Sequence, residues 1–267
     1  DWPRLVERKL HESGQKNIEV LNLGTPGHST TDAVGKLLTE GHRFEPDIVL
    51  LDYAWNDLKY FASDDLLHRQ QPPFTESYRS QYYNSIDRLL CRSSRLYLAG
   101  RWAAQAVANR LALSGLITGP EGVYPDREIV SSMTDAGPNQ YELNVRTFIS
   151  IANSIGAKPV LVTQPTLVRC DNTAEEQAMI NLKYVSMNHE TLCKATAKIY
   201  EIIHRVGQET NTPVIDAAGY VLPKIENFTD VVHTSPLGSE RISEVVSKRL
   251  VETLAELKPE ETNELIE

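Results

Sequence analysis

Asp230 and His233 stand three residues apart near the C-terminal end of the chain, just before the run Thr234-Ser235-Pro236-Leu237-Gly238. A carboxylate at this spacing can accept a hydrogen bond from an imidazole and hold its tautomer. It can also stabilise the imidazolium that forms when the histidine takes a proton from a nucleophile. The pattern equally fits a surface turn that leads into a helix, with Asp230 as a capping residue. The pair is therefore a candidate general base with its orienting acid.

A glycine-containing block, Asn22–Ser29, overlaps the end of the apolar run Ile18–Leu23, which has the length of a short strand. Gly27 lies in this block, and a residue without a Cβ lets its backbone N–H approach a reacting carbonyl oxygen. The alternative is an ordinary glycine in a strand-to-helix turn. Gly27 is thus a candidate hydrogen-bond donor to an oxyanion.

A third block, Asp52–Asp57, follows the apolar run Ile48–Leu51. Its Asn56 carries an amide that can donate to an oxyanion, and loss of one such donor costs on the order of 3 kcal/mol of transition-state stabilisation. The alternative is an Asx turn at a strand end. Because ligands bind at the carboxyl ends of strands in open α/β sheets, we expect the three blocks to meet at one edge.

Apolar runs alternate with helical periods along the chain, which predicts parallel βαβ units and an α/β fold. Strands are predicted at residues 18–23, 47–51, 158–163 and 213–216, and helices at 2–10, 30–41, 139–155, 188–206 and 236–257. Residues 58–137 break this rhythm and predict a helical insertion over the active edge, with helices near 76–90 and 94–113. We therefore expect residues 1–257 to form a single domain that contains this insertion, followed by a polar tail, 258–267.

The three blocks, in this order, resemble the SGNH hydrolases (the GDSL esterase/lipase superfamily). The resemblance covers Trp2 to about Leu250 apart from the insertion; Ala54 stands where the family usually has glycine. It implies a three-layer α/β/α sandwich around a flavodoxin-like parallel sheet. It also implies that His233 is the base and Asp230 its partner, that Gly27 and Asn56 donate to the oxyanion, and that no metal or organic cofactor is needed.

The resemblance also implies a nucleophilic serine in a turn after the first strand, and that block is not in the chain. Trp2-Pro3 matches the start of the helix that follows it, so the serine is expected roughly a dozen residues before Asp1. Ser29 and Ser235 stand next to the other blocks, where the family has no nucleophile, and Ser13 lies in a helix-to-strand turn. Our hypothesis is that the chain belongs to a longer protein whose first strand and serine lie upstream, and that the chain alone is inactive and prone to aggregate.

Three functions remain open at this point. The first is a serine esterase or acyl hydrolase that acts on a small-molecule or glycan ester through an acyl-enzyme. The second is an O-acetyltransferase or carbohydrate deacetylase that uses the same site. The third is a non-catalytic binding module.

Composition narrows the range of partners. A net charge of −9 and a pI near 5.4 argue against nucleic acid as a partner. No run of about 18 apolar residues is present, so we predict no membrane span. Cys91, Cys170 and Cys193 have no metal-like spacing and are predicted to be ordinary thiols outside any disulfide framework. Compartment and oligomeric state are left undetermined.

Overall fold

A computed structural model describes residues 1–63, 90, 94–97, 99–100, 103 and 128–257. The two helices predicted within the insertion fall largely outside these residues, as does the predicted tail. The described residues form an α/β structure around one parallel sheet, as predicted.

The sheet has three strands in the order β1-β2-β3, with β1 at Ile48–Leu51, β2 at Lys158–Val162 and β3 at Val214–Ile215. Both pairings are parallel. All three strands are rich in valine, isoleucine and leucine, which suits strands covered on both faces. Their alternating side chains supply two separate hydrophobic clusters, one on each face of the sheet.

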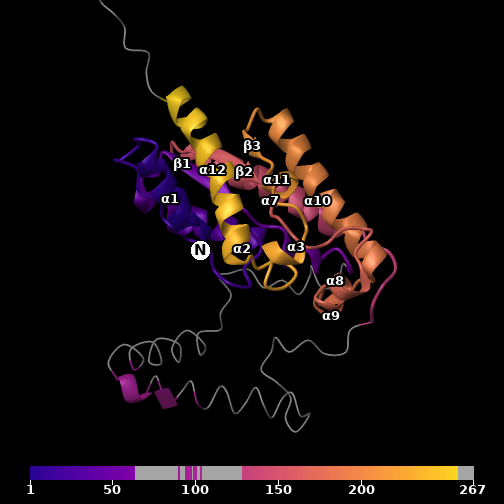
Figure 1. Ribbon diagram of the computed structural model, residues 1–267. Coiled ribbons are helices and arrows are strands. Elements are labelled where there is room, and N and C mark those ends of the chain that lie inside the picture. Colours follow the sequence, from indigo (N-terminus) through magenta and orange to yellow (C-terminus); the bar gives the residue numbers. More distant parts are fainter. Residues whose placement is uncertain (64–89, 91–93, 98, 101–102, 104–127, 258–267) are drawn as a thin grey trace, which may run out of the picture.

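Helices cover both faces and make a three-layer α/β/α sandwich (Figure 1). On one face, Val160 and Val162 of β2 pack with the first and last helices, which lie against each other. On the other face, Leu161 packs against the remaining long helices. The bounds are α1 (Trp2–Glu12) and α12 (Pro236–Leu257) on the first face, and α2 (Thr30–Thr39), α7 (Ala136–Ser154) and α10 (His189–Glu209) on the second.

Short elements connect these layers: η1 (Gly41–Phe44), α3 (Trp55–Leu58), α8 (Ala174–Ala178), α9 (Leu182–Val185), α11 (Ala217–Tyr220) and η2 (Ile225–Asn227). The five long helices and three of the four predicted strands lie within a few residues of their predicted bounds. No helix among the described residues combines the length and apolarity needed to cross a bilayer.

The prediction of a strand at Ile18–Leu23 is wrong: this segment is neither helix nor strand, and it pairs with no strand among the described residues. Side chains of α1 bind its backbone instead. The Glu7 carboxylate accepts the Val20 N–H at 2.7 Å, and Nε2 of His11 lies 2.7 Å from the Ile18 carbonyl oxygen. The apolar pattern is that of a strand, but a strand also needs a neighbouring backbone, and β1 pairs only with β2 among the described residues.

The prediction that the cysteines are ordinary thiols is also wrong for two of them. Cys170 and Cys193 form a disulfide, with their Cα atoms 5.4 Å apart. Cys170 lies in the long connection after β2, and Cys193 lies in the first part of α10. Their separation of 23 residues carries no signal in the sequence, because the fold alone brings them together. Cys91 lies outside the described residues.

We expect Gly207→Ala to destabilise the protein, although alanine in a helix interior is normally about 1 kcal/mol more stabilising than glycine. A Cβ at this position of α10 would lie 2.3 Å from Cγ2 of Val214 and 3.0 Å from the Thr212 carbonyl oxygen. Overpacking of this kind typically costs about 1–3 kcal/mol.

Urea unfolding measures this effect. The double variant Gly207→Ala/Val214→Ala should lose less stability than the two single changes added together, because the second change removes the atom that the new Cβ meets. A more stable Gly207→Ala variant would contradict the close packing of α10 on β3.

Candidate active site

The side chains of Asp230 and His233 are hydrogen-bonded to each other. Nδ1 of His233 lies 2.6 Å from Oδ2 of Asp230. The other carboxylate oxygen, Oδ1, accepts the backbone N–H groups of Val232 at 2.9 Å and His233 at 2.8 Å. Partial burial raises the pKa of Asp230, but these hydrogen bonds outweigh burial and hold the pKa below its ordinary value. Asp230 is therefore ionised, and its carboxylate accepts a hydrogen bond from Nδ1 of His233.

A tight loop before α12 presents this pair. The backbone N–H of Thr229 donates to the His233 carbonyl oxygen at 2.7 Å, and Phe228 forms an isolated antiparallel bridge with Thr234. Ser235 then accepts the Gly238 N–H at 3.1 Å, as the cap of the last helix. Gly238 must lack a side chain here, because a Cβ would lie 2.1 Å from the Asn227 carbonyl oxygen. The loop thus fixes both ends of the Asp230–His233 segment.

The other ring nitrogen of His233 faces outward. The side chain is 76% exposed, and within the described ranges Nε2 makes no hydrogen bond. Ser13, Ser29 and Ser235 make hydrogen bonds within their own turns and caps. Ser13 donates to the Leu10 carbonyl oxygen, Ser235 donates to Glu226, and the fully buried Ser29 binds the Asp32 carboxylate in a capping box of α2. Ser29 is the N-cap residue of this helix.

Gly27 occupies a turn that requires glycine. Its φ is +81°, a conformation that other residues rarely adopt. The turn runs from Thr25 to His28 and is closed by a hydrogen bond of 3.2 Å from the His28 N–H to the Thr25 carbonyl oxygen. Pro26 and Gly27 are the residue types favoured at the two central positions of a type II turn. The Gly27 N–H donates to no acceptor in the part of the chain that the structure describes, so the geometry suits a donor to a ligand.

Asn56 lies directly against this turn. It follows β1, in the short helix α3, and its Nδ2 donates to the His28 carbonyl oxygen at 2.7 Å. Its Oδ1 accepts a hydrogen bond from the hydroxyl of Tyr184. The structure therefore brings together the two predicted oxyanion donors, Gly27 and Asn56, as neighbours of His28.

The connection after β2 joins these donors to the Asp230–His233 loop. The Gln164 side chain accepts the Trp55 N–H at 2.9 Å, next to Asn56. Three residues later, the Leu167 N–H donates to the Val231 carbonyl oxygen at 2.8 Å. Val231 is buried in the same hydrophobic cluster as Trp55. All four predicted site residues are thus tied to the carboxyl edge of β1 and β2.

Asp57, which the sequence did not single out, anchors the start of α2. Both its carboxylate oxygens accept the Thr30 N–H, at 3.0 and 3.2 Å, and Oδ1 also accepts the Thr30 hydroxyl hydrogen. Asn144 of α7 donates to the same threonine hydroxyl oxygen at 2.9 Å. Burial raises the pKa of Asp57 to about 7, although the bonds from Thr30 lower it. The neighbouring Asp52 is raised to about 7 by burial as well. The only sequence signal for this anchoring role of Asp57 is that it directly follows Asn56. Its partner Thr30 is 27 residues away, so the sequence does not reveal the contact.

No group of three or more histidine, cysteine, aspartate or glutamate side chains in the described ranges could hold a metal ion.

We expect Asp57→Asn to flatten the pH dependence of stability. In the folded chain Asp57 keeps its proton up to about pH 7, whereas an unfolded aspartate loses it near pH 4. The folded state thus binds more protons between these values, so stability falls as pH rises through this window and levels off above it. The variant should remove part of that fall and leave the part contributed by Asp52.

Urea midpoints at pH 5, 6, 7 and 8 test this expectation. Asp171→Asn is the matched control, because the Asp171 side chain is 85% exposed. An unchanged pH slope in the Asp57 variant would show that its carboxyl group titrates alike in both states.

No protein-family model matches the chain, and no curated protein does. Solved structures do. A lipase/acylhydrolase from Enterococcus faecalis is 16% identical, with a TM-score of 0.53 over 94% of this chain and 85% of its own. The acetyl xylan esterase AlAXEase is 13% identical, with a TM-score of 0.53 over 93% and 90%. A catalytic mutant of an acetylxylan esterase from Geobacillus stearothermophilus is 12% identical, with a TM-score of 0.51 over 93% and 80%. The predicted fold is confirmed: the chain has the α/β fold of the SGNH hydrolases.

Proposed function

We propose that this chain carries the acid–base pair and the oxyanion donors of a serine ester hydrolase. The observation that carries the proposal is the 2.6 Å contact between Asp230 Oδ2 and His233 Nδ1, with the carboxylate held by two backbone N–H groups. A capping aspartate needs only the backbone bonds. The additional bond to the ring places the imidazole in the tautomer that leaves Nε2 free to accept a proton.

The proposed reaction divides the work among these groups. A serine hydroxyl attacks the ester carbonyl while Nε2 of His233 takes its proton, and Asp230 stabilises the imidazolium. The Gly27 N–H and the Asn56 amide donate to the tetrahedral oxyanion. The imidazolium then protonates the departing alcohol, and a water molecule releases the acyl group by the same steps. The chain's own residues need no metal or cofactor for this.

We further propose that the serine belongs to chain upstream of Asp1, on a strand that pairs with β1. Ile18 and Val20 pack against the same hydrophobic cluster as Ile48 and Leu50 of β1, as residues of a second strand would. Yet α1 side chains bind the Ile18–Leu23 backbone, and β1 pairs only with β2 among the described residues. A strand between the two segments would satisfy both edges.

Acetyl esters are the substrates we favour. Two of the similar structures are described as acetyl xylan esterases, and the same site could serve a carbohydrate deacetylase or an O-acetyltransferase. Transfer and hydrolysis are distinguished by the acceptor: acetylated polysaccharide formed from a soluble acetyl donor would favour the transferase. Ligand binding without any turnover would instead favour a binding module.

We expect the longer protein to hydrolyse p-nitrophenyl acetate and acetylated xylan, and the 267-residue chain alone to show no activity. His233→Ala should lower kcat by at least about 10⁴-fold. Asp230→Asn should lower it about as far, because Oδ1 can keep its backbone bonds while an amide N–H facing Nδ1 imposes the wrong tautomer.

His42→Ala is the control, since His42 is an exposed residue of η1. Steady-state kinetics with a folded longer protein decide the matter. Undiminished hydrolysis in the His233 variant would refute the assignment of the base.

A further inference from the structure

We propose that Tyr184 is a positioning residue for the oxyanion hole, held in place by a disulfide-closed segment between β2 and α10. This inference rests on the proposed function, because it concerns the Asn56 donor. Its structural part, the bond between Tyr184 and Asn56, can be tested without any activity.

The hydrogen bonds of Asn56 fix the orientation of its amide. The His28 carbonyl oxygen can only accept, so the amide atom that faces it is Nδ2. Tyr184 then donates its hydroxyl hydrogen to Oδ1 on the other side. Nδ2 has two hydrogens and uses one on His28, which leaves one for a ligand. Without the tyrosine hydroxyl, Oδ1 loses this donor and the amide loses the contact that opposes its rotation.

Aromatic packing fixes the tyrosine in turn. Its ring stacks on Trp55, the residue before Asn56, with centroids 5.8 Å apart and planes 8° from parallel. The Lys59 ammonium lies 6.0 Å from the centroid of the same ring, at the limit of a cation–π contact. The ring therefore packs against α3 and the residue that follows it, and α3 also carries the Asn56 amide.

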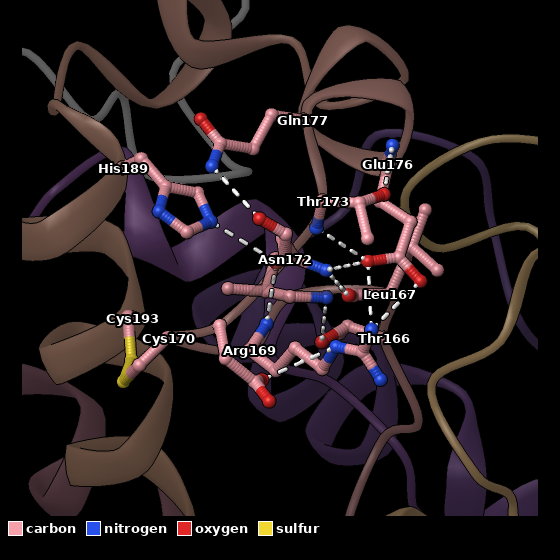
Figure 2. Close-up of polar contacts among 12 residues, drawn as sticks. Thr166, Leu167, Arg169, Cys170, Asn172, Thr173, Glu176, Gln177, His189 and Cys193 are labelled. Carbon is pink, nitrogen blue, oxygen red and sulfur yellow. Dashed lines mark hydrogen bonds and ion pairs between the residues drawn. A yellow bond between two sulfur atoms is a disulfide. The ribbon is translucent and has the colours of Figure 1, made fainter.

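Tyr184 itself comes from α9, in the long connection between β2 and α10. The Cys170–Cys193 disulfide closes the first part of this connection onto α10. Beside the disulfide, the Arg169 guanidinium binds the buried Glu176 carboxylate at 2.8 and 3.0 Å, and Glu176 also accepts a hydrogen bond from Asn172 (Figure 2).

The ends of the connection are fixed as well. Near the start of the connection, Asn172 makes several hydrogen bonds. Oδ1 of Asn172 lies 3.0 Å from Nε2 of His189 and accepts the Arg169 N–H at 2.8 Å (Figure 2). Past α9, the Val130 N–H donates to the Ser186 carbonyl oxygen at 2.9 Å. A segment tied at its start, along its length and at its end can hold the tyrosine hydroxyl on Asn56.

Tyr184→Phe tests the inference in the active longer protein. We expect kcat to fall, by up to the 10²-fold or so that loss of a whole oxyanion donor costs, with KM unchanged. Tyr220→Phe is the matched control, because its hydroxyl binds Glu244 at 3.2 Å on the surface.

A double-mutant cycle separates positioning from general support. In an Asn56→Ala background, Tyr184→Phe should have no further effect on kcat, because the amide that it positions is gone. The same further loss in both backgrounds would overturn the proposal. An Asn56→Ala variant with full kcat would overturn it as well.

Nuclear magnetic resonance provides a readout that does not depend on esterase activity. In the ¹⁵N-labelled protein, the side-chain NH₂ signals of Asn56 are assigned by their loss in Asn56→Asp. We expect Tyr184→Phe, and reduction of the disulfide, to shift these signals and to speed their exchange with water. Unchanged signals would overturn the proposal even if the protein hydrolyses esters. Shifted signals in a protein without esterase activity would refute the proposed function alone.

Discussion

The hydrogen bonds that leave the carboxyl end of β2 hold the candidate site together. Gln164 binds the Trp55 backbone beside Asn56, and Leu167 binds the Val231 backbone inside the Asp230–His233 loop. Residues 164–167 thus connect α3, which carries Asn56, with the loop that carries Asp230 and His233. Because β2 is the central strand, with β1 on one side and β3 on the other, it is the natural place from which both halves of a site can be positioned.

Much of this arrangement could be predicted from sequence. β1 and β2 are almost wholly apolar because both of their faces are covered. Of the three predicted blocks, Asn22–Ser29 lies just before α2, Asp52–Asp57 follows β1, and Asp230–His233 lies just before α12. What failed has a common physical cause. The apolar run Ile18–Leu23 has the composition of a strand, but strand formation depends on a partner backbone, about which the local sequence says nothing.

The disulfide and Tyr184 were missed for a related reason. Cys170 and Cys193 are 23 residues apart, and Tyr184 meets Asn56 across 128 residues. Neither contact lies within one helix or strand, where periodicity could reveal it. The residue types are also common ones, since a tyrosine or a lone cysteine pair carries no signature comparable to that of an aspartate spaced before a histidine. Such contacts are set by the packing of layers and become visible only in three dimensions.

The two proposed oxyanion donors, Asn56 and Gly27, share one support. The Asn56 amide gives one hydrogen to the carbonyl oxygen of His28, which directly follows Gly27. That bond uses half of the donor capacity of Nδ2, yet it couples the amide to the turn that carries the second proposed donor, Gly27. Donors that move together keep their spacing, and fixed spacing is what allows preorganised dipoles to stabilise developing charge without reorganisation.

Asp57 supports the same arrangement, because its bonds to Thr30 hold the start of α2, just after the turn, against α3. A buried carboxyl with a raised pKa makes this support costly above pH 7. Because Asp57 directly follows Asn56, this support lies next to both proposed donors.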